Sequence, residues 1–286
     1  MWLWLPLGVF GLLLVVWPWW LRLAFAAAIG ALPWAWLPLA MGKGDQAPQW
    51  RVVSANVHYC VLLLVTNIVT RPQWRVVSAN VHYSNRDPAP LLAWAAASNV
   101  DLIVVHELHP AYAQALLAAP AWPHRHLMPR LDASGIGLLS RWPLREVRQA
   151  DGEGGIPQLR ARVMTPQGEA EVIALHPMPP ITLQWQRARN RTFAALRPSG
   201  KAPALAIGDY NATPWSNASP ILVEGGWRWF GGLQPTWPHG AWGIPIDAVW
   251  GHGPWEVVGH EVGPSIGSDH RPLRVDLRLA ASLAHR

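Results

Sequence analysis

The chain has 286 residues, of which 51% are hydrophobic and 14% charged, and its formal net charge is +6. The apolar content excludes an intrinsically disordered chain, and the single cysteine, Cys60, excludes an intrachain disulfide framework. The positive charge suits an anionic partner such as nucleic acid, a phosphorylated metabolite or a lipid headgroup, without choosing among them.

The first 43 residues contain two long apolar runs, residues 2–20 and 23–41, separated by Arg22. Each run is about as long as a helix that crosses the hydrocarbon core of a membrane, and tryptophans cluster near the ends of the runs, as is typical of membrane interfaces. We therefore predict a transmembrane helical hairpin over residues 1–43. The alternatives are a single kinked re-entrant span and a cleaved signal peptide, which would have a basic start and one short apolar core. The few charges leave the side of the membrane undetermined.

An internal repeat follows: the segment PQWRVVSANVHY occupies residues 48–59 and recurs unchanged at residues 72–83. Its alternating, β-branched pattern predicts a strand, and two copies are too few for a solenoid, so we interpret it as a tandem duplication. Only one copy can fill a given place in a sheet. We assign residues 44–71 to a linker carrying the first copy and residues 72–286 to the main domain, because the second copy lies one helix and one strand before Glu107.

From residue 84 onward, the pattern alternates between strands and helices, which predicts an α/β domain. Asp87 and Pro88 predict the start of a helix that continues to residue 98. A second helix is expected over residues 183–196. Apolar or alternating runs predict strands at residues 101–105, 135–140, 158–165, 169–176, 202–209, 246–250 and 272–279.

Polar side chains collect near the ends of these strands, where sites on a sheet scaffold tend to lie. The residues are Asn80, Glu107, His176, Asp209, Asn211, Asp247, Asp269 and His270. Any one of them alone is ordinary at a strand end. Together they supply oxygen ligands for a magnesium-type ion and nitrogen donors for a phosphate group.

Four motifs carry a resemblance to a known family: GDYNATPWS at residues 208–216, GSDHRPL at 267–273, SRWPL at 140–144 and PTW at 235–237. On these motifs, residues 72–286 resemble the endonuclease/exonuclease/phosphatase superfamily of DNase I-like metal-dependent phosphoesterases. The resemblance implies a four-layer α/β sandwich of two packed mixed β-sheets flanked by helices. With its apolar N-terminus, the chain is similar to bacterial membrane-anchored members, which implies a multi-pass protein of the bacterial inner membrane.

The resemblance also implies a role for each site residue in hydrolysis of a phosphate ester by in-line attack of water, without a covalent enzyme intermediate. The expected Mg²⁺ ligands, with Mn²⁺ as an alternative ion, are Glu107, Asn80 and Asp269. The expected catalytic residues are Asp209, which orients or deprotonates water; Asn211, which holds the water or the phosphoryl oxygens; Asp247, which hydrogen-bonds and orients His270; His270, which faces the phosphoryl charge; and His176, which donates to the phosphate or to the leaving oxygen.

Some features leave alternatives open. His106 stands where the family usually has Gln, and HELH at residues 106–109 invites a zinc interpretation, although that motif needs two histidines four apart on a helix. Three arginines, at positions 187, 189 and 191, either meet a phosphate backbone or form a solvated helix face. The substrate is a nucleic acid, a lipid-linked phosphate or a small phosphoester. The competing function is a catalytically dead, membrane-anchored binding or scaffold protein, which the retained acidic and histidine residues disfavour.

Overall fold

The computed structural model describes residues 74–166, 168–240 and 242–280. The predicted membrane anchor at residues 1–43, the linker at 44–71 and the first copy of the repeat lie outside the described residues and stay predictions. In the part of the chain that is described, no helix has the length and apolar character needed to span a membrane.

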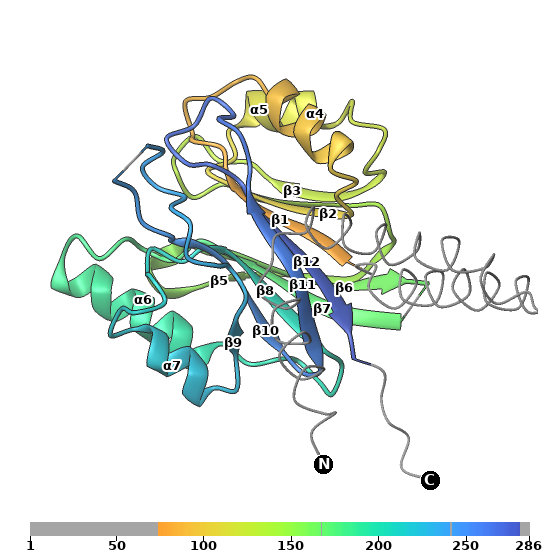
Figure 1. The fold of residues 1–286 in the computed structure, drawn as a ribbon. Helices are drawn as coiled ribbons and strands as arrows, with labels where there is room; N and C mark the ends of the chain where they lie inside the picture. The colour runs from red at the N-terminus through yellow and green to blue at the C-terminus, as the bar shows by residue number, and fades with distance from the viewer. Residues whose placement is uncertain (1–73, 167, 241, 281–286) are drawn as a thin grey trace, which may run out of the picture. The chain divides into compact units, whose positions relative to one another are not determined.

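Two six-stranded sheets form the centre of the described domain (Figure 1). The first has the order β11-β12-β1-β2-β4-β3, and its strands are β1 (Trp74–Asn80), β2 (Leu102–His106), β3 (His124–Met128), β4 (Ile136–Ser140), β11 (Trp255–Val262) and β12 (Leu273–Leu279). The second has the order β5-β6-β7-β8-β10-β9, and its strands are β5 (Leu144–Asp151), β6 (Pro157–Thr165), β7 (Gly168–Leu175), β8 (Ala204–Asp209), β9 (Arg228–Trp229) and β10 (Asp247–His252). Both sheets are mixed, because β1 pairs in parallel with β2 and β7 with β8, whereas the other pairs are antiparallel.

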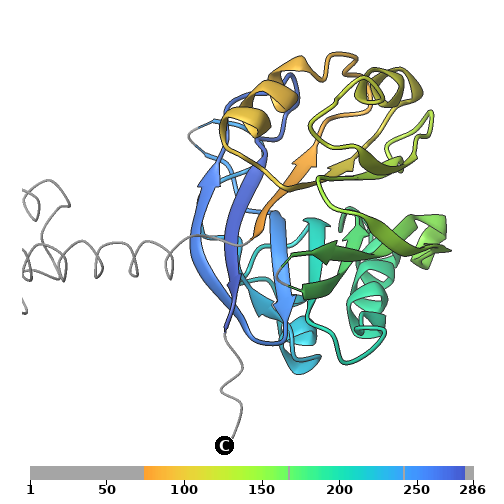
Figure 2. The same ribbon diagram turned by 90° about the vertical axis from the view of Figure 1, so that its right-hand side faces the viewer.

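Helices cover the outer face of each sheet, which gives the four layers that the resemblance implied (Figure 2). Helices α4 (Ala89–Ala97) and α5 (Pro110–Leu116) pack on the first sheet, and α6 (Leu183–Ala195) and α7 (Ser219–Glu224) pack on the second. The first helix starts one residue later than predicted, because Pro88 and not Asp87 takes the N-cap position. Asp87 Oδ1 still accepts a hydrogen bond from Ala89 N at 2.9 Å. The prediction of two packed mixed sheets with flanking helices is confirmed.

The alternation of side chains along each strand builds three apolar layers. In β2, Leu102 and Val104 belong to the core between the sheets, while Ile103 and Val105 pack under α4 and α5. The same two-residue period holds in β1, β7, β8 and β10. A polar residue two positions beyond the last inter-sheet apolar residue, such as His106 in β2, therefore lies at the edge of this inter-sheet core.

The second copy of the repeat forms β1, in the middle of the first sheet between β12 and β2. Its side chains Trp74 and Val76 are fully buried in the inter-sheet core. Residues after this copy hold it in place: Asn85 Nδ2 donates to the carbonyl of Ile266 at 2.9 Å, and Asp87 Oδ1 accepts from the first backbone N–H of α4. The first copy has no equivalents of these residues behind it, since its Tyr59 leads into an apolar run.

Candidate active site

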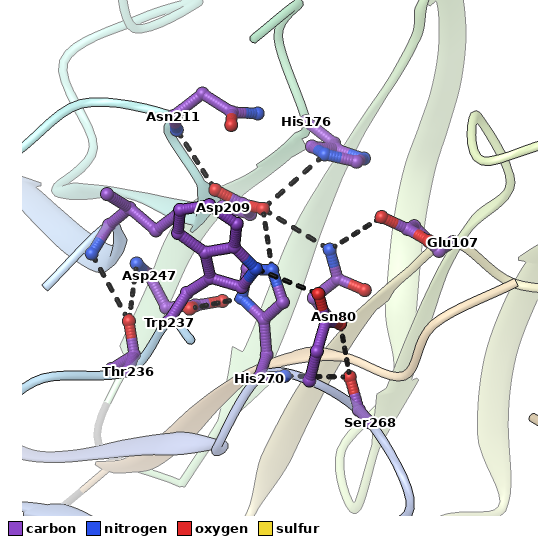
Figure 3. Close-up of polar contacts among 12 residues, drawn as sticks. Asn80, Glu107, His176, Asp209, Asn211, Thr236, Trp237, Asp247, Ser268 and His270 are labelled. Carbon is purple, nitrogen blue, oxygen red and sulfur yellow. Dashed lines mark hydrogen bonds and ion pairs between the residues drawn. The ribbon is translucent and has the colours of Figure 1, made fainter. Parts of the chain in front are cut away.

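The predicted site residues gather where the strands of both sheets end on their inter-sheet face (Figure 3). Asn80 ends β1 and Asp209 ends β8. Asp247 begins β10 and lies opposite Asp209 in register, because β10 runs antiparallel to β8. Glu107 and His176 follow directly after β2 and β7. Asn80, His176, Asp209 and Asp247 thus meet because each continues the inter-sheet side of its own strand. Glu107 stands one position past that side of β2, and its left-handed backbone departs from the strand alternation.

Asp209 is the centre of the arrangement. Its Oδ2 accepts a hydrogen bond from Asn80 Nδ2 at 3.2 Å and lies 3.5 Å from His176 Nε2 and 3.6 Å from His270 Nε2. Its Oδ1 accepts from the backbone N of Asn211 at 2.9 Å. Burial alone would raise the pKa of Asp209, but His270, His176 and the Asn211 N–H outweigh it and lower this pKa. Asp209 is therefore ionised at neutral pH.

His270 and Asp247 form a buried pair, with 2.8 Å between His270 Nδ1 and Asp247 Oδ2. Burial lowers the pKa of His270, but the carboxylates of Asp247 and Asp209 raise it overall to about 9. Burial also raises the pKa of Asp247, an effect that His270 opposes. Thr236 Oγ1 holds this segment by accepting hydrogen bonds from Ile246 N and Asp247 N, both at 3.2 Å. His270 is consequently a cation whose ring is fixed by Asp247.

Glu107 lies next to this cluster in a left-handed backbone conformation, with φ of 58°. Its Oε1 accepts from Asn80 Nδ2 at 2.9 Å and its Oε2 from the backbone N of Tyr83 at 3.0 Å. Asn80 Oδ1 in turn accepts from the backbone N of His82 at 3.0 Å. The Asn80 amide thus places its Nδ2 between the carboxylates of Glu107 and Asp209. A left-handed non-glycine residue held by its surroundings is typical of functional sites.

Two groups of residues offer ligands for a divalent metal ion. The side chains of Asp209, Asp247 and His270 lie close enough together to hold one. Both ring nitrogens of His270 face carboxylates, however, and a cationic histidine has no lone pair for a metal. Each carboxylate oxygen of Glu107 accepts one hydrogen bond and keeps a free lone pair, and a site with few carboxylates suits Mg²⁺, which retains several waters. The carboxylate of Glu107 is therefore a second candidate ligand for a divalent ion, beside the cluster of Asp209, Asp247 and His270.

Asp269 lies on the exposed loop that also carries His270. Its Oδ2 accepts a hydrogen bond from Trp237 Nε1 at 2.8 Å, and the Trp237 ring lies 6.1 Å from that of His270. Within the described ranges, the Asp269 carboxylate makes no hydrogen bond or ion pair with Asn80 or Glu107. The structure therefore places Asp269 next to Trp237 and His270, and its role as a metal ligand stays a prediction.

Asn211 does not point freely into the site. Its Nδ2 donates to the carbonyl of Pro177 at 3.1 Å, which ties the end of β8 to the residue after His176. Arg189 supports it from α6, where Nη1 donates to the carbonyl of Asn211 at 2.6 Å. Asn211 thus ties the end of β8 to the His176 segment, and its role in holding water or the phosphoryl oxygens stays a prediction.

The three arginines of α6 differ in their surroundings. Arg189 is 3% exposed, so both interpretations made from the sequence, a phosphate contact and a solvated face, are wrong for it. Arg191 pairs with Glu153 at 2.9 Å, and Arg187 is exposed. The spacing of Arg189 from Phe193, four residues along the same helix face, was the signal that it is buried.

The two histidines of HELH do not share a helix. His106 ends β2, is fully buried and stacks edge-on against His176 with 5.8 Å between ring centroids. His109 instead begins α5, where its Nδ1 accepts from Ala111 N. Burial lowers the pKa of His106 to about 3, so the ring is neutral. This arrangement does not provide the helix face that the zinc motif needs, and His106 lines the sheet interior.

A sandwich of two mixed sheets with an Asp–His site at one edge defines the DNase I-like class of fold. The chain belongs to the Endonuclease/Exonuclease/phosphatase family, whose model matches residues 77–270. Members of this family are hydrolases that act on phosphoester bonds and generally use divalent metal ions.

Solved structures show the same fold at low sequence identity. An endonuclease/exonuclease/phosphatase from Beutenbergia cavernae is 21% identical, with a TM-score of 0.60 over 73% of this chain and 72% of that one. The D. rerio TDP2 complexed with single strand DNA product is 15% identical, with a TM-score of 0.60 over 72% and 98%. Sphingomyelinase C from Streptomyces griseocarneus is 16% identical, with a TM-score of 0.53 over 72% and 99%. No curated protein matches the sequence.

Proposed function

We propose that the protein is a Mg²⁺-dependent, membrane-tethered phosphoesterase that hydrolyses a phosphate ester by in-line attack of water. The observation that carries this proposal is the convergence of two imidazoles, His176 and His270, within 3.6 Å of the buried carboxylate of Asp209, with Glu107 linked to the same carboxylate through Asn80. Imidazole donors next to a fixed carboxylate provide the groups needed to bind a phosphoryl group and to position a water molecule.

Three residues of the site have separate roles in the proposed hydrolysis. Asp209 orients the attacking water. Its lowered pKa makes it a weak proton acceptor, which favours orienting over deprotonating. The cationic His270, held by Asp247, donates to the phosphoryl oxygens as negative charge develops on them. His176, whose Nε2 lies 3.5 Å from Asp209 Oδ2 (Figure 3), donates to the leaving oxygen.

A magnesium ion bound at Glu107, with Asn80 and Asp269 as further ligands, would supply a positive charge next to a phosphate oxygen. Hydrolysis of p-nitrophenyl phosphate or bis-p-nitrophenyl phosphate by the full-length protein, measured with Mg²⁺, with Mn²⁺ and with EDTA, tests the proposal. We expect turnover of at least one ester with Mg²⁺ and none with EDTA. No turnover under any condition would favour the dead scaffold on the same fold.

Glu107→Gln is expected to weaken activation by Mg²⁺ by about 10- to 100-fold, because it removes the charge of the main proposed ligand and keeps the size of the side chain. The fold should persist, since Glu107 lies at the rim of the site and is only half-buried. The measurement is the Mg²⁺ concentration for half-maximal activity. Glu224→Gln, on the exposed end of α7, is the matched control. An unchanged Mg²⁺ requirement in Glu107→Gln would refute this ligand assignment.

We further propose that residues 1–43 anchor the protein in the bacterial inner membrane, with a nucleic acid, a lipid-linked phosphate or a small phosphoester as substrate. The apolar runs of the sequence support the anchor. Recovery of the full-length protein in the soluble fraction after cell lysis would exclude it.

A further inference from the structure

A cavity of about 400 Å³ opens beside the proposed catalytic residues. Its walls are the loop between β3 and β4, the turn between β5 and β6, the segment that follows β7, and the first turn of α6. Its lining includes Arg130, Ala133, Ile156, His176, Met178 and Trp185. His176 belongs both to the lining of this cavity and to the cluster around Asp209, so the two sites are adjacent.

The cavity walls are mainly carbon. Ile156, Met178 and Trp185 are half-buried, and Pro177 and Pro179 complete the same side. A recess of this volume lined by apolar and aromatic side chains is typical of small-molecule sites, which enclose about 300–1,000 Å³.

The charged groups at the cavity already have partners within the protein. Arg130 Nη2 lies 3.8 Å from Asp151 Oδ1, and Asp132 Oδ1 accepts from the backbone N of Ser134 at 2.9 Å. The Arg130 guanidinium is 41% exposed at this long ion pair, so it stands at the solvent side of the cavity. A ligand group in contact with Ile156, Met178 and Trp185 gains mostly from apolar contact.

Hydrogen bonds hold the cavity walls in place. Asn211 Nδ2 fixes the carbonyl of Pro177 at 3.1 Å, and the buried Arg189 fixes Asn211 in turn. Thr182 Oγ1 accepts from Trp185 N at 3.2 Å and so sets the start of α6. Because these bonds link the cavity to the catalytic strands, the apolar wall keeps a constant position relative to His176.

We propose that this cavity binds the leaving alcohol of the substrate, and that this alcohol carries an aromatic ring system or a similarly bulky apolar group. The inference rests on the proposed function, in which His176 faces the leaving oxygen. A group attached to that oxygen enters the cavity, because His176 forms one of its walls. The aromatic face of Trp185 and the flexible, polarisable side chain of Met178 suit a planar apolar group.

The test compares 2-naphthyl with phenyl phosphate esters, in whichever of the monoester or diester series the protein turns over. The two leaving groups are chemically alike and differ mainly in apolar area. We expect kcat/KM of the full-length protein to favour the naphthyl ester by about tenfold, as expected for the extra apolar area that it buries.

Ala133→Trp should fill the cavity and bring this ratio close to one, because Ala133 is an exposed loop residue at the cavity wall. Ala96→Trp, the same change at an exposed position of α4 that does not line the cavity, should keep the wild-type ratio. Trp185→Ala removes a wall instead of filling the space and should also lower the ratio. The proposal would be overturned if the wild type had the same kcat/KM for the naphthyl and phenyl esters. It would also be overturned if neither Ala133→Trp nor Trp185→Ala changed the ratio of the two values.

A binding measurement tests the cavity even if the protein hydrolyses no phosphoester. If no phosphoester is hydrolysed, isothermal titration calorimetry in EDTA compares 2-naphthyl phosphate with inorganic phosphate. Tighter binding of the naphthyl compound by the wild type and Ala96→Trp, lost in Ala133→Trp, would support the cavity as an apolar subsite without turnover. The same affinity for both compounds in all three proteins would refute it.

Discussion

Alanine in place of His270 is expected to lower kcat by about 10³- to 10⁴-fold, and alanine in place of Asp247 by a similar factor. The His270 variant lacks the cationic donor that faces the developing phosphoryl charge. Asp247 is fully buried, so it acts through His270, which it contacts at 2.8 Å between Oδ2 and Nδ1. Steady-state kinetics on the ester that the wild type hydrolyses measure both losses.

The double variant separates a coupled pair from two independent groups. If Asp247 acts only by orienting and charging His270, the double variant should be little slower than the slower single variant, because residues that act as a unit are not additive. Losses that multiply in the double variant would show that Asp247 has a separate role. Thermal unfolding of each variant separates loss of chemistry from loss of fold.

The pH profile adds a readout that a merely structural role of Asp247 would not change. The carboxylates of Asp247 and Asp209 raise the pKa of His270 to about 9, so His270 is protonated below this pH and activity should fall as the pH rises through it. Asp247→Asn keeps the size of the side chain but removes the largest of the three carboxylate charges, those of Asp247, Asp209 and Asp269, that raise this pKa. Its remaining activity should therefore decline at a lower pH than that of the wild type.

The sequence predicted the interior strands of both sheets and missed the edge strands. The four strands absent from the sequence prediction, β3, β5, β9 and β11, each lie at the edge of a sheet in the described part of the chain. An edge strand is covered less completely, so its side chains need not be apolar: β5 is largely exposed and β3 is half-buried throughout. Such strands lack the regular alternation of apolar and polar residues by which a strand is predicted from sequence.

The short helices α5 and α7 were missed for a different reason. Each begins with or next to a proline, at Pro110 and Pro220, and has seven residues or fewer. Such segments are too short to display a helical period, because two turns of a helix already need about seven residues. Their formation depends on burial of side chains such as Tyr112 and Leu222 against the sheets.

Sequence reasoning located the polar residues of the site because each stands at the end of an apolar strand. It could not show which of them touch, since contacts between strands depend on register and on the packing of the two sheets. The supporting groups Thr236 and Arg189 are examples: Thr236 holds Asp247 through a backbone N–H, and Arg189 holds a carbonyl. The sequence marks Thr236 through the PTW motif and Arg189 through its spacing from Phe193, but it does not show which backbone groups they contact.

Asn80→Ala is expected to lower kcat/KM by about 10²- to 10³-fold, the typical loss for one preorganised donor in an active site. Asn80 Nδ2 donates to Glu107 Oε1 at 2.9 Å and to Asp209 Oδ2 at 3.2 Å. Without the amide, two like-charged carboxylates face each other without a donor between them, which disfavours the ionised form of both. Kinetics at saturating Mg²⁺ measure the effect.

The duplicated segment provides a control that few proteins offer. Asn56 occupies the same place in an identical stretch of sequence, so Asn56→Ala makes the same chemical change in the same local context. Only the second copy is followed by Asn85 and Asp87, which fasten β1 to the loop at Ile266 and to α4. We therefore expect Asn56→Ala to retain wild-type activity.

Deletion of residues 48–71 extends the same argument, because it removes the first copy and leaves β1 with all its neighbours. The shortened protein should fold and hydrolyse the same ester as the full-length chain. If Asn56→Ala abolished activity while Asn80→Ala did not, the first copy would be the one in the sheet. The second copy would then have left the core with Trp74 and Val76, at a cost of about 1.5–3 kcal/mol for each large apolar side chain exposed, and the start of the catalytic domain would have to move before residue 72.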